Sequence, residues 1–296
     1  MEAKPTGQSR LIMGTMRLGK WGANFTKHQY AEFVEVCLEN GIDTFDLADI
    51  YGDHTQETDF GEGIAGTDLR GKIRLITKCG ICRPDENRTD YKLKHYNTSR
   101  DHIISSVENS LQQLGSRYID LLLIHRPDAL MDADEVAEAF TRLKMAGKVL
   151  AFGVSNFSPM QYDLLNERFP LVANQIQANV LHLEPFLDGT LDHAQLRKAE
   201  VQAWSPLGGG VMFDEDSEDE RVLRVREAAE PLRQKYGATL DQILLAWLLR
   251  HPAGIRPVLG TTKLTRLHVA AKALEIELER DEWYSLWSAS TGKPVP

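Results

Sequence analysis

The stretch Tyr118–His125, YIDLLLIH, decides the fold class of this chain. Five of its eight residues are Ile or Leu, and polar residues do not alternate with them. A strand this apolar is covered on both faces, which is typical of a parallel sheet packed between helices. The next segment, 132–147, carries acids in its first turn and ends at glycine, so it is predicted to be a helix. A buried strand followed by a helix is the repeating unit of an α/β fold.

The same unit recurs on both sides of this stretch. The expected strands are 10–18, 42–46, 73–79, 118–125, 149–155, 172–180, 201–207 and 255–260. The expected helices are 27–40, 58–66, 98–115, 132–147, 158–169, 188–199, 220–237, 239–251, 263–276 and 279–290. Gly41 is a predicted helix stop, Thr98 or Ser99 an N-cap, and Ser158 an N-cap followed by proline at N1.

Eight strands that are each followed by a helix predict an α/β fold of the (β/α)₈ TIM barrel type. We expect a single domain over residues 1–296, with extra helices near the C-terminus. A doubly wound sheet is the alternative, but no G-x-G-x-x-G sequence opens any of the strand–helix units.

Composition excludes several classes of partner. Lys and Arg number 34 against 43 Asp and Glu, so the net charge is −9, which argues against nucleic-acid and anionic-membrane binding. There is no run of 18 apolar residues, and residues 1–10 lack the apolar segment of a secretory signal. The three cysteines, Cys37, Cys79 and Cys82, are interpreted as reduced thiols in a cytoplasmic protein without a metal site. Nothing in the sequence requires more than a monomer.

Polar residues whose side chains can take part in catalysis lie where the predicted strands end. The second strand ends at Asp46, with Tyr51 in the loop after it. The third strand ends at Lys78, and the fourth ends at His125. In a barrel, functional residues collect at the carboxyl ends of the strands, so we expect these four side chains at one rim. Taken alone, Asp46 and Lys78 fit a structural ion pair about equally well.

Together the four residues suit proton donation to a carbonyl oxygen. A free tyrosine, with a pKa near 10, is a weak acid at neutral pH. An ammonium group from Lys78 beside Tyr51 is expected to lower the pKa of the phenol, while Asp46 holds the lysine charged and in place. His125 could donate a hydrogen bond to the same carbonyl and orient it. To reduce the carbonyl bound by these two donors, the site would need only a hydride in addition.

The segment that holds Asp46 and Tyr51 resembles a signature of a known family. GIDTFDLADIYG, residues 41–52, resembles the G-x-x-x-F-D-x-A-x-x-Y-G signature of the aldo-keto reductases. The resemblance continues in family order through LITKCG, YIDLLLIHRPD, GKVLAFGVSNFSP, NQIQANVLH, AWSPLGGG and IRPVLGTTKLTRL. The HRPD ending of the fourth strand is similar to that of the family's bacterial oxidoreductase branch. The resemblance implies that Asp46, Tyr51, Lys78 and His125 form the catalytic tetrad, with Tyr51 as general acid, for reduction of a small-molecule aldehyde or ketone to an alcohol.

The resemblance also implies NADPH as cofactor and a set of residues that bind it. Ser155, Asn156 and Gln175 match the residues that hold the nicotinamide carboxamide, and Trp204 matches the aromatic residue that stacks on the ring. The residues that match the phosphate-binding segments are Ser205, Leu207, Gly209, Gly260, Thr261, Thr262, Lys263 and Arg266. Lys263 and Arg266 supply cations for a 2′-phosphate, which favours NADPH over NADH.

The chain departs from the family pattern in two places, and three of its residues are candidates for the substrate pocket. Ala270 stands where many members carry an asparagine that contacts adenine. The acidic segment 214–220 would repel the cofactor phosphates if it folded inward, so we expect it to face solvent. Arg17, Trp21 and Arg126 are candidates to line the substrate pocket.

Two further residues and two alternative functions are considered. Glu57 fits either a family acid or a helix-start acid, and His54 fits polar surface. A non-catalytic cofactor-sensing or partner-binding subunit is the alternative function. A metal-dependent barrel hydrolase would need a ligand cluster such as H-x-H at a strand end, and this sequence has none.

Overall fold

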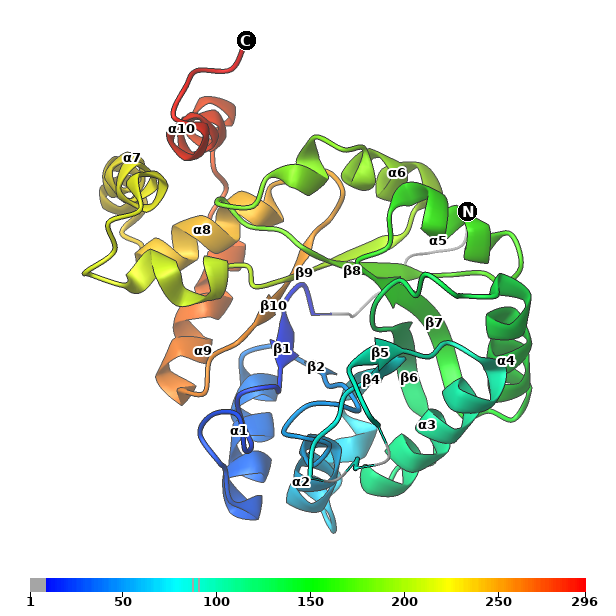
Figure 1. The fold of residues 1–296 in the computed structure, drawn as a ribbon. Helices are drawn as coiled ribbons and strands as arrows, with labels where there is room; N and C mark the ends of the chain where they lie inside the picture. Colours follow the sequence, from blue (N-terminus) through cyan, green and yellow to red (C-terminus); the bar gives the residue numbers. More distant parts are fainter. Residues whose placement is uncertain (1–8, 87, 90) are drawn as a thin grey trace.

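Eight parallel strands close into a barrel in the order β1, β10, β9, β8, β7, β6, β3, β2, with helices around it (Figure 1). The structure, a computed structural model, describes residues 9–86, 88, 89 and 91–296. The barrel strands are β1 (Ile12–Gly14), β2 (Thr44–Asp46), β3 (Arg74–Cys79), β6 (Ile119–Ile124), β7 (Val149–Ser155), β8 (Ala173–Gln177), β9 (Glu200–Trp204) and β10 (Arg256–Leu259). The predicted barrel is confirmed. The expectation about a secretory signal falls mainly on residues 1–8, outside the described residues.

Helices follow the strands and form the outer layer. They are α1 (Lys27–Glu39), α2 (Gln56–Ile64), α3 (Arg100–Gln113), α4 (Ala133–Met145), α5 (Pro159–Asn166), α6 (Thr190–Arg197), α7 (Glu220–Tyr236), α8 (Leu240–Leu249), α9 (Leu264–Ala271) and α10 (Arg280–Thr291). Four short 3₁₀ turns are Leu69–Gly71, Glu184–Phe186, Gly208–Phe213 and Lys272–Glu275. Helices α7 and α10 pack together outside the ring, as the expected extra helices near the C-terminus (Figure 1). No helix in the described part of the chain is long and apolar enough to cross a membrane.

Local sequence signals set most of the helix ends. Ser158 caps α5 in a capping box with Gln161, and Pro159 occupies the first turn. Gly41 follows α1 with a φ of 72°, a left-handed conformation that glycine adopts without steric cost. Of the two N-caps left open for α3, Ser99 holds the position, while the Thr98 hydroxyl donates to Asp128 Oδ2 at 2.9 Å.

Two features differ from the sequence expectation. Strand β1 spans Ile12–Gly14 rather than 10–18, because the chain turns at once: Leu18 N donates to Thr15 O, and Leu18 packs in the core. A small antiparallel pair, β4 (Ile81–Cys82) and β5 (His95–Tyr96), lies between β3 and α3. Strands of two residues are too short to show an alternating pattern, so the sequence gives no signal for them.

The core has an inner and an outer layer. Inside the barrel lie the apolar residues Ile12, Ile76, Leu121, Leu123, Ala173 and Val258. The amino ends of the strands are closed by a polar group in which Arg256 contacts Glu200 at 2.6 Å and Thr44 Oγ1 at 3.2 Å. With that end closed, the carboxyl ends of the strands remain for a binding site.

Candidate active site

Strand register places three of the predicted residues on the inner face of the barrel. Asp46 pairs with Ile76 of β3, and Lys78 lies two residues further along that strand. Lys78 pairs with Leu123 of β6, and His125 again follows two residues later. Because strand side chains repeat every two residues, each step of two keeps the side chain on the same face while moving it toward the carboxyl end. Asp46, Lys78 and His125 therefore lie on the same face of three neighbouring strands, each one step nearer the carboxyl end of the barrel.

Lys78 is the centre of a buried hydrogen-bond group. Its side chain is 1% exposed, and its Nζ donates to Asp46 Oδ2 at 2.7 Å, Leu47 O at 2.8 Å and Tyr51 Oη at 3.0 Å. These contacts use all three ammonium hydrogens, so the charge is fixed in position. Burial by itself lowers the pKa of Lys78, but the charges and hydrogen bonds of Asp46 and Tyr51 outweigh it and raise that pKa. The lysine stays protonated at neutral pH.

Tyr51 reaches the same point from the loop after β2. A turn closed by Tyr51 N and Ala48 O, at 3.1 Å, and left-handed conformations at residues 52–54 bring the ring back over the strand end. Burial raises the pKa of Tyr51, and Lys78 acts in the opposite direction without cancelling it. The expected net lowering of the pKa is therefore wrong in this structure, because the cost of burying a phenolate exceeds the attraction of the ammonium. Tyr51 holds its proton firmly.

The His125 ring lies next to the ring of Tyr51. The two rings meet edge to face with centroids 6.0 Å apart. Burial, followed by the charges of Lys78, Arg126 and Lys94, holds the pKa of His125 well below its usual value, so the imidazole is neutral. Nδ1 is buried without a hydrogen-bond partner among the described residues, and the His125 side chain lines the cavity. A neutral imidazole can donate one hydrogen bond there.

A cavity of about 800 Å³ opens above these residues. Asp46, Tyr51 and His125 line its floor, and Lys78 lies beneath them. Most residues of 205–210 and several of 259–270 line one part of the wall, and residues after β1, β3 and β6 line another. A volume of this size lies within the range typical of small-molecule and cofactor sites.

The four residues expected at the nicotinamide all line this cavity. Asn156 Nδ2 donates to Ser155 Oγ at 2.8 Å, and Asn156 Oδ1 accepts from Trp204 Nε1 at 2.9 Å. Gln175 Nε2 donates to Asp46 Oδ1 at 2.8 Å, a contact that the sequence did not predict. Asp46 therefore has a second partner, which fixes both of its oxygens.

The predicted phosphate-binding segments lie in the other half of the cavity. Ser205, Leu207, Gly209, Gly260, Thr261 and Arg266 line it. Gly209 has a φ of 68°, and an added Cβ there or at Gly260 would meet nothing within 4 Å, so the wall is bare backbone. Thr262 and Lys263 do not line the cavity, and the Lys263 side chain is exposed. Ala270 lines it, and the acidic segment 214–220 stays outside the lining and is largely exposed, as expected.

Arg17, Trp21 and Arg126, which the sequence offers as substrate-pocket candidates, also line the cavity, together with residues that the sequence did not single out; the part that they line is called here the substrate half. Trp21 is held by a 3.1 Å hydrogen bond from its Nε1 to Asp53 Oδ1 and lies beside Tyr51, with ring centroids 6.2 Å apart. Lys94 joins from the segment before β5. No motif marks Lys94, because its position depends on the unpredicted β4–β5 pair.

Two polar residues near the tetrad are more buried than the sequence suggested. His54 is buried rather than on the surface, with Nε2 3.3 Å from Asp85 Oδ2. Glu57 accepts hydrogen bonds from Thr77 Oγ1 at 2.6 Å and Ser110 Oγ at 2.8 Å, so it joins α2 to β3 and α3. Glu57 does lie in the first turn of α2, as the helix-start interpretation expected, but its carboxyl group is buried rather than solvated.

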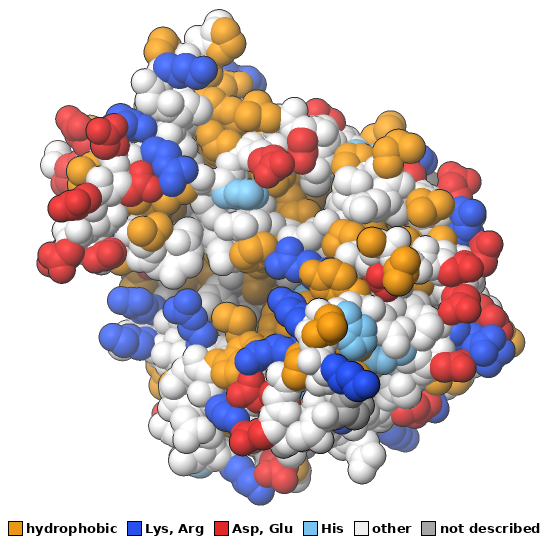
Figure 2. Space-filling model, viewed as in Figure 1, with side chains coloured by type: hydrophobic (Ala, Val, Ile, Leu, Met, Phe, Trp, Pro, Cys, Tyr) orange, Lys and Arg blue, Asp and Glu red, His pale blue; other side chains and the backbone are white. Residues whose placement is uncertain are grey.

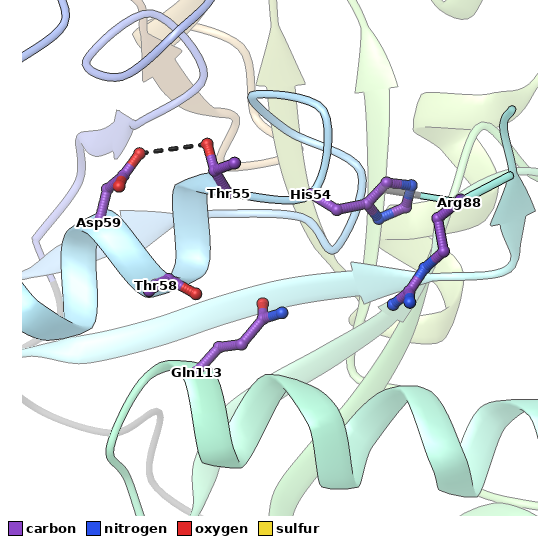
Figure 3. A pocket seen from close by; sticks show the side chains of 6 residues that line it. All are labelled: His54, Thr55, Thr58, Asp59, Arg88 and Gln113. Carbon is purple, nitrogen blue, oxygen red and sulfur yellow. Dashed lines mark hydrogen bonds between the residues drawn. The ribbon is translucent and has the colours of Figure 1, made fainter. Parts of the chain in front are cut away.

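A second pocket, of about 320 Å³, lies at the start of α2 (Figure 3). Its lining residues are His54, Thr55, Thr58, Asp59, Arg88 and Gln113. Thr55 Oγ1 donates to Asp59 Oδ2 at 3.2 Å, and Gln113 enters from α3 (Figure 3). This pocket shares no lining residue with the large cavity and holds none of the tetrad. Across the described ranges, no group of three or more His, Cys, Asp or Glu is placed to hold a metal ion.

Comparison with known proteins agrees with this arrangement. The sequence model of the aldo/keto reductase family matches residues 10–290. Oxidoreductase YcsN of Bacillus subtilis is 46% identical over 292 residues, which is 97% of this chain and 96% of YcsN. A 6-dehydroglucose reductase of Agrobacterium fabrum is 41% identical over 290 residues, 97% of this chain and 96% of its own.

A solved structure supports the same conclusion. The thermostable aldo-keto reductase Tm1743, in complex with the inhibitor epalrestat, superposes with a TM-score of 0.81 at 26% identity, over 98% of each chain. Members of the family generally bind nicotinamide cofactors. With a closed (β/α)₈ barrel, a family match over nearly its whole length and bacterial oxidoreductases among its relatives, the chain belongs to the aldo-keto reductase family and is an oxidoreductase.

Proposed function

We propose that this protein reduces an aldehyde or ketone to the alcohol with NADPH, using Tyr51 as proton donor. The observation that carries the proposal is the hydrogen bond from Lys78 Nζ to Tyr51 Oη, 3.0 Å long, at the floor of the large cavity. Because Lys78 donates to the phenol oxygen, the hydroxyl hydrogen of Tyr51 is free to point elsewhere. The cavity is where an acceptor for that hydrogen would lie.

The residues of the cavity fit a nicotinamide dinucleotide. Bare glycine backbone along 208–210, with positive φ at each residue, suits close approach of phosphate groups. Trp204 offers an aromatic face, and Asn156 and Ser155 hold one another beside it. The bound cofactor would supply a hydride to the carbonyl carbon. Arg266 would pair with a 2′-phosphate, which supports NADPH as the preferred form.

The chain's own residues would then manage the proton and the carbonyl oxygen. Tyr51 donates its proton to the oxygen as negative charge develops there, so the carbonyl becomes a neutral alcohol. Lys78, held by Asp46 and Leu47 O, stabilises the phenolate that remains on Tyr51. The raised pKa of Tyr51 keeps the donor protonated before reaction. His125, as a neutral donor, orients the carbonyl from the other side.

A non-catalytic subunit is not favoured. A buried Asp–Lys–Tyr group costs desolvation energy, and its tyrosine lines the cavity, which supports a catalytic role over cofactor or partner binding alone. The relative named as a 6-dehydroglucose reductase is itself a reductase of a carbonyl compound, which supports the same reaction class here.

Substitution of Tyr51 by phenylalanine tests the proton-donor role. General acid catalysis contributes about 10²- to 10⁴-fold, so Tyr51→Phe should lose turnover by that factor with an aldehyde such as 4-nitrobenzaldehyde. NADPH binding should change by less than about threefold, because the ring remains in place. Stopped-flow NADPH oxidation and nucleotide fluorescence titration measure the two quantities. Equal loss of both would mean that Tyr51 shapes the site rather than donates the proton.

A further inference from the structure

We propose that the carbonyl substrate carries an anionic group (carboxylate, phosphate or sulfonate) that binds three cations at the mouth of the large cavity. These cations are Arg17, Lys94 and Arg126, called here the cationic rim. The inference rests on the proposed function, because it names the substrate class of the same site.

The rim is assembled from three separate parts of the chain. Arg17 follows β1, Lys94 precedes β5, and Arg126 directly follows His125 at the end of β6. The Arg126 guanidinium lies 5.5 Å from the centroid of the Trp204 ring, so it faces the cavity. Arg126 directly follows His125 in the sequence, and both line the cavity together with Lys94.

Within the described part of the chain, the rim cations have no ion-pair partner, unlike the basic residues next to them. Nearby Lys20 and Arg83 already pair with Asp53, at 3.1 and 3.2 Å. By contrast, no carboxylate in the described ranges forms an ion pair with any of the three rim residues within 4.0 Å.

The carboxylates of the cavity wall are also engaged. The acids that line the cavity are Asp46 and Asp241. Asp46 is bound to Lys78, and Asp241, on the cofactor side, accepts from Thr239. The rim therefore presents positive charge to whatever enters the substrate half.

The rim also stands out against the rest of the molecule. The chain has a net charge of −9, yet basic side chains gather around the hollow near the centre of the face in Figure 2, and most acidic ones lie further out. A cleft lined by charge of one sign concentrates ligands of the opposite sign. Opposite charges attract each other more strongly near a protein surface than in bulk water, because the effective dielectric constant is lower there. Two or three such contacts are enough to decide substrate choice.

The cofactor does not account for these cations. The segments suited to its phosphates are 205–210 and 260–266, after β9 and β10, whereas the rim residues belong to the segments after β1, β3 and β6. Trp21, Ile50 and Ile81 line the same cavity and lie beside Tyr51, so they offer an apolar surface for the carbon body of a substrate. The geometry fits a carbonyl at Tyr51, an apolar body against Trp21 and an anionic end at the rim.

A pair of aldehydes that differ in charge tests the inference. With NADPH saturating, kcat/KM is measured for 4-carboxybenzaldehyde and for its neutral methyl ester, methyl 4-formylbenzoate. The wild type should prefer the anion by about tenfold or more, and 0.5 M NaCl should reduce the preference, because salt screens charges at an open mouth. Lys94→Gln should lower the ratio at least threefold, and Lys94→Glu should lower it further. Arg17→Gln with Arg126→Gln should bring it close to one.

Lys92→Gln is the matched control, because Lys92 is exposed two residues away and does not line the cavity. It should leave the ratio within twofold of the wild type. Reduction of both aldehydes at similar rates, with a ratio that the rim substitutions do not move, would overturn the inference and leave the proposed function intact. Failure to reduce either aldehyde by a folded, NADPH-binding protein would overturn the proposed function itself. Lys94 is on the surface, so its variants remain informative even where the double variant does not fold.

Discussion

Glu57 illustrates how a single buried residue supports the site from behind. Its carboxyl group is 1% exposed and accepts hydrogen bonds from Thr77 and Ser110. Thr77 immediately precedes Lys78, so the contact also helps to position the strand end that carries the lysine. Burial raises the pKa of Glu57 from 4.5 to about 7, and the two hydroxyl contacts only partly oppose this. The acid is therefore protonated below neutral pH and charged above it.

Stability should fall with rising pH because of this residue. Between pH 4.5 and 7 the folded protein binds a proton that the unfolded chain releases, so the contribution of Glu57 is fully present below pH 4.5 and is lost as pH rises through 7. From pH 5 to pH 8 the loss amounts to about 2 to 3 kcal/mol at 1.36 kcal/mol per pKa unit. Glu57→Gln keeps the hydrogen-bonding shape and removes the titration. Urea unfolding at both pH values should show a smaller fall for the variant, and identical falls would contradict the prediction.

At the scale of elements, the junction of β10 with α9 separates two cations that look equivalent in the sequence. Gly260, Thr261 and Arg266 line the cavity. Lys263 instead occupies the N-cap position of α9, where its backbone N donates to Thr261 Oγ1 at 3.1 Å and its side chain points away from the lining. The turn of the helix therefore selects Arg266 as the better placed partner for a phosphate.

Cofactor preference should depend more on Arg266 than on Lys263. A hydrogen bond to a charged group is worth about 1.5 to 3 kcal/mol, so Arg266→Ala should weaken NADPH binding roughly 10- to 100-fold. NADH, which lacks the 2′-phosphate, should be weakened by less than about threefold. Lys263→Ala serves as the matched comparison and should weaken NADPH less than Arg266→Ala does. Fluorescence titration gives all the dissociation constants, and equal weakening of both nucleotides would show that Arg266 does not bind the 2′-phosphate.

At the scale of the whole molecule, barrel closure limits which residues fit between neighbouring strands. Gly153 lies in β7 opposite Ala173 of β8. A Cβ at Gly153 would come within 2.7 Å of Ala173 O and 2.8 Å of Leu123 Cδ2. The backbone atom cannot move without shifting β8, which carries Gln175 and its bond to Asp46. Packing at the barrel wall and geometry at the site are thereby connected.

Gly153→Ala should therefore destabilise the whole barrel. Overpacking in a close-packed interior costs about 1 to 3 kcal/mol, which calorimetry would record as a lower Tm. Gly71→Ala is the control, because its added Cβ would meet nothing within 4 Å and its φ is not left-handed. That substitution should change stability by less than about 1 kcal/mol. Equal effects at the two positions would show that the close approach at Gly153 is relieved without cost.

The sequence by itself determined the barrel, the eight strand–helix units and the placement of Asp46, Lys78 and His125 at strand ends. Apolar periodicity and glycine stops are local signals, and in a parallel barrel a strand-end residue such as Asp46, Lys78 or His125 is carried to the common rim by the topology alone. The tertiary structure decided the rest. The bond from Gln175 to Asp46 joins residues 129 positions apart, and no local pattern encodes such a pairing. The net direction of the Tyr51 pKa depends on how burial weighs against the Lys78 charge, and burial exists only in the folded chain.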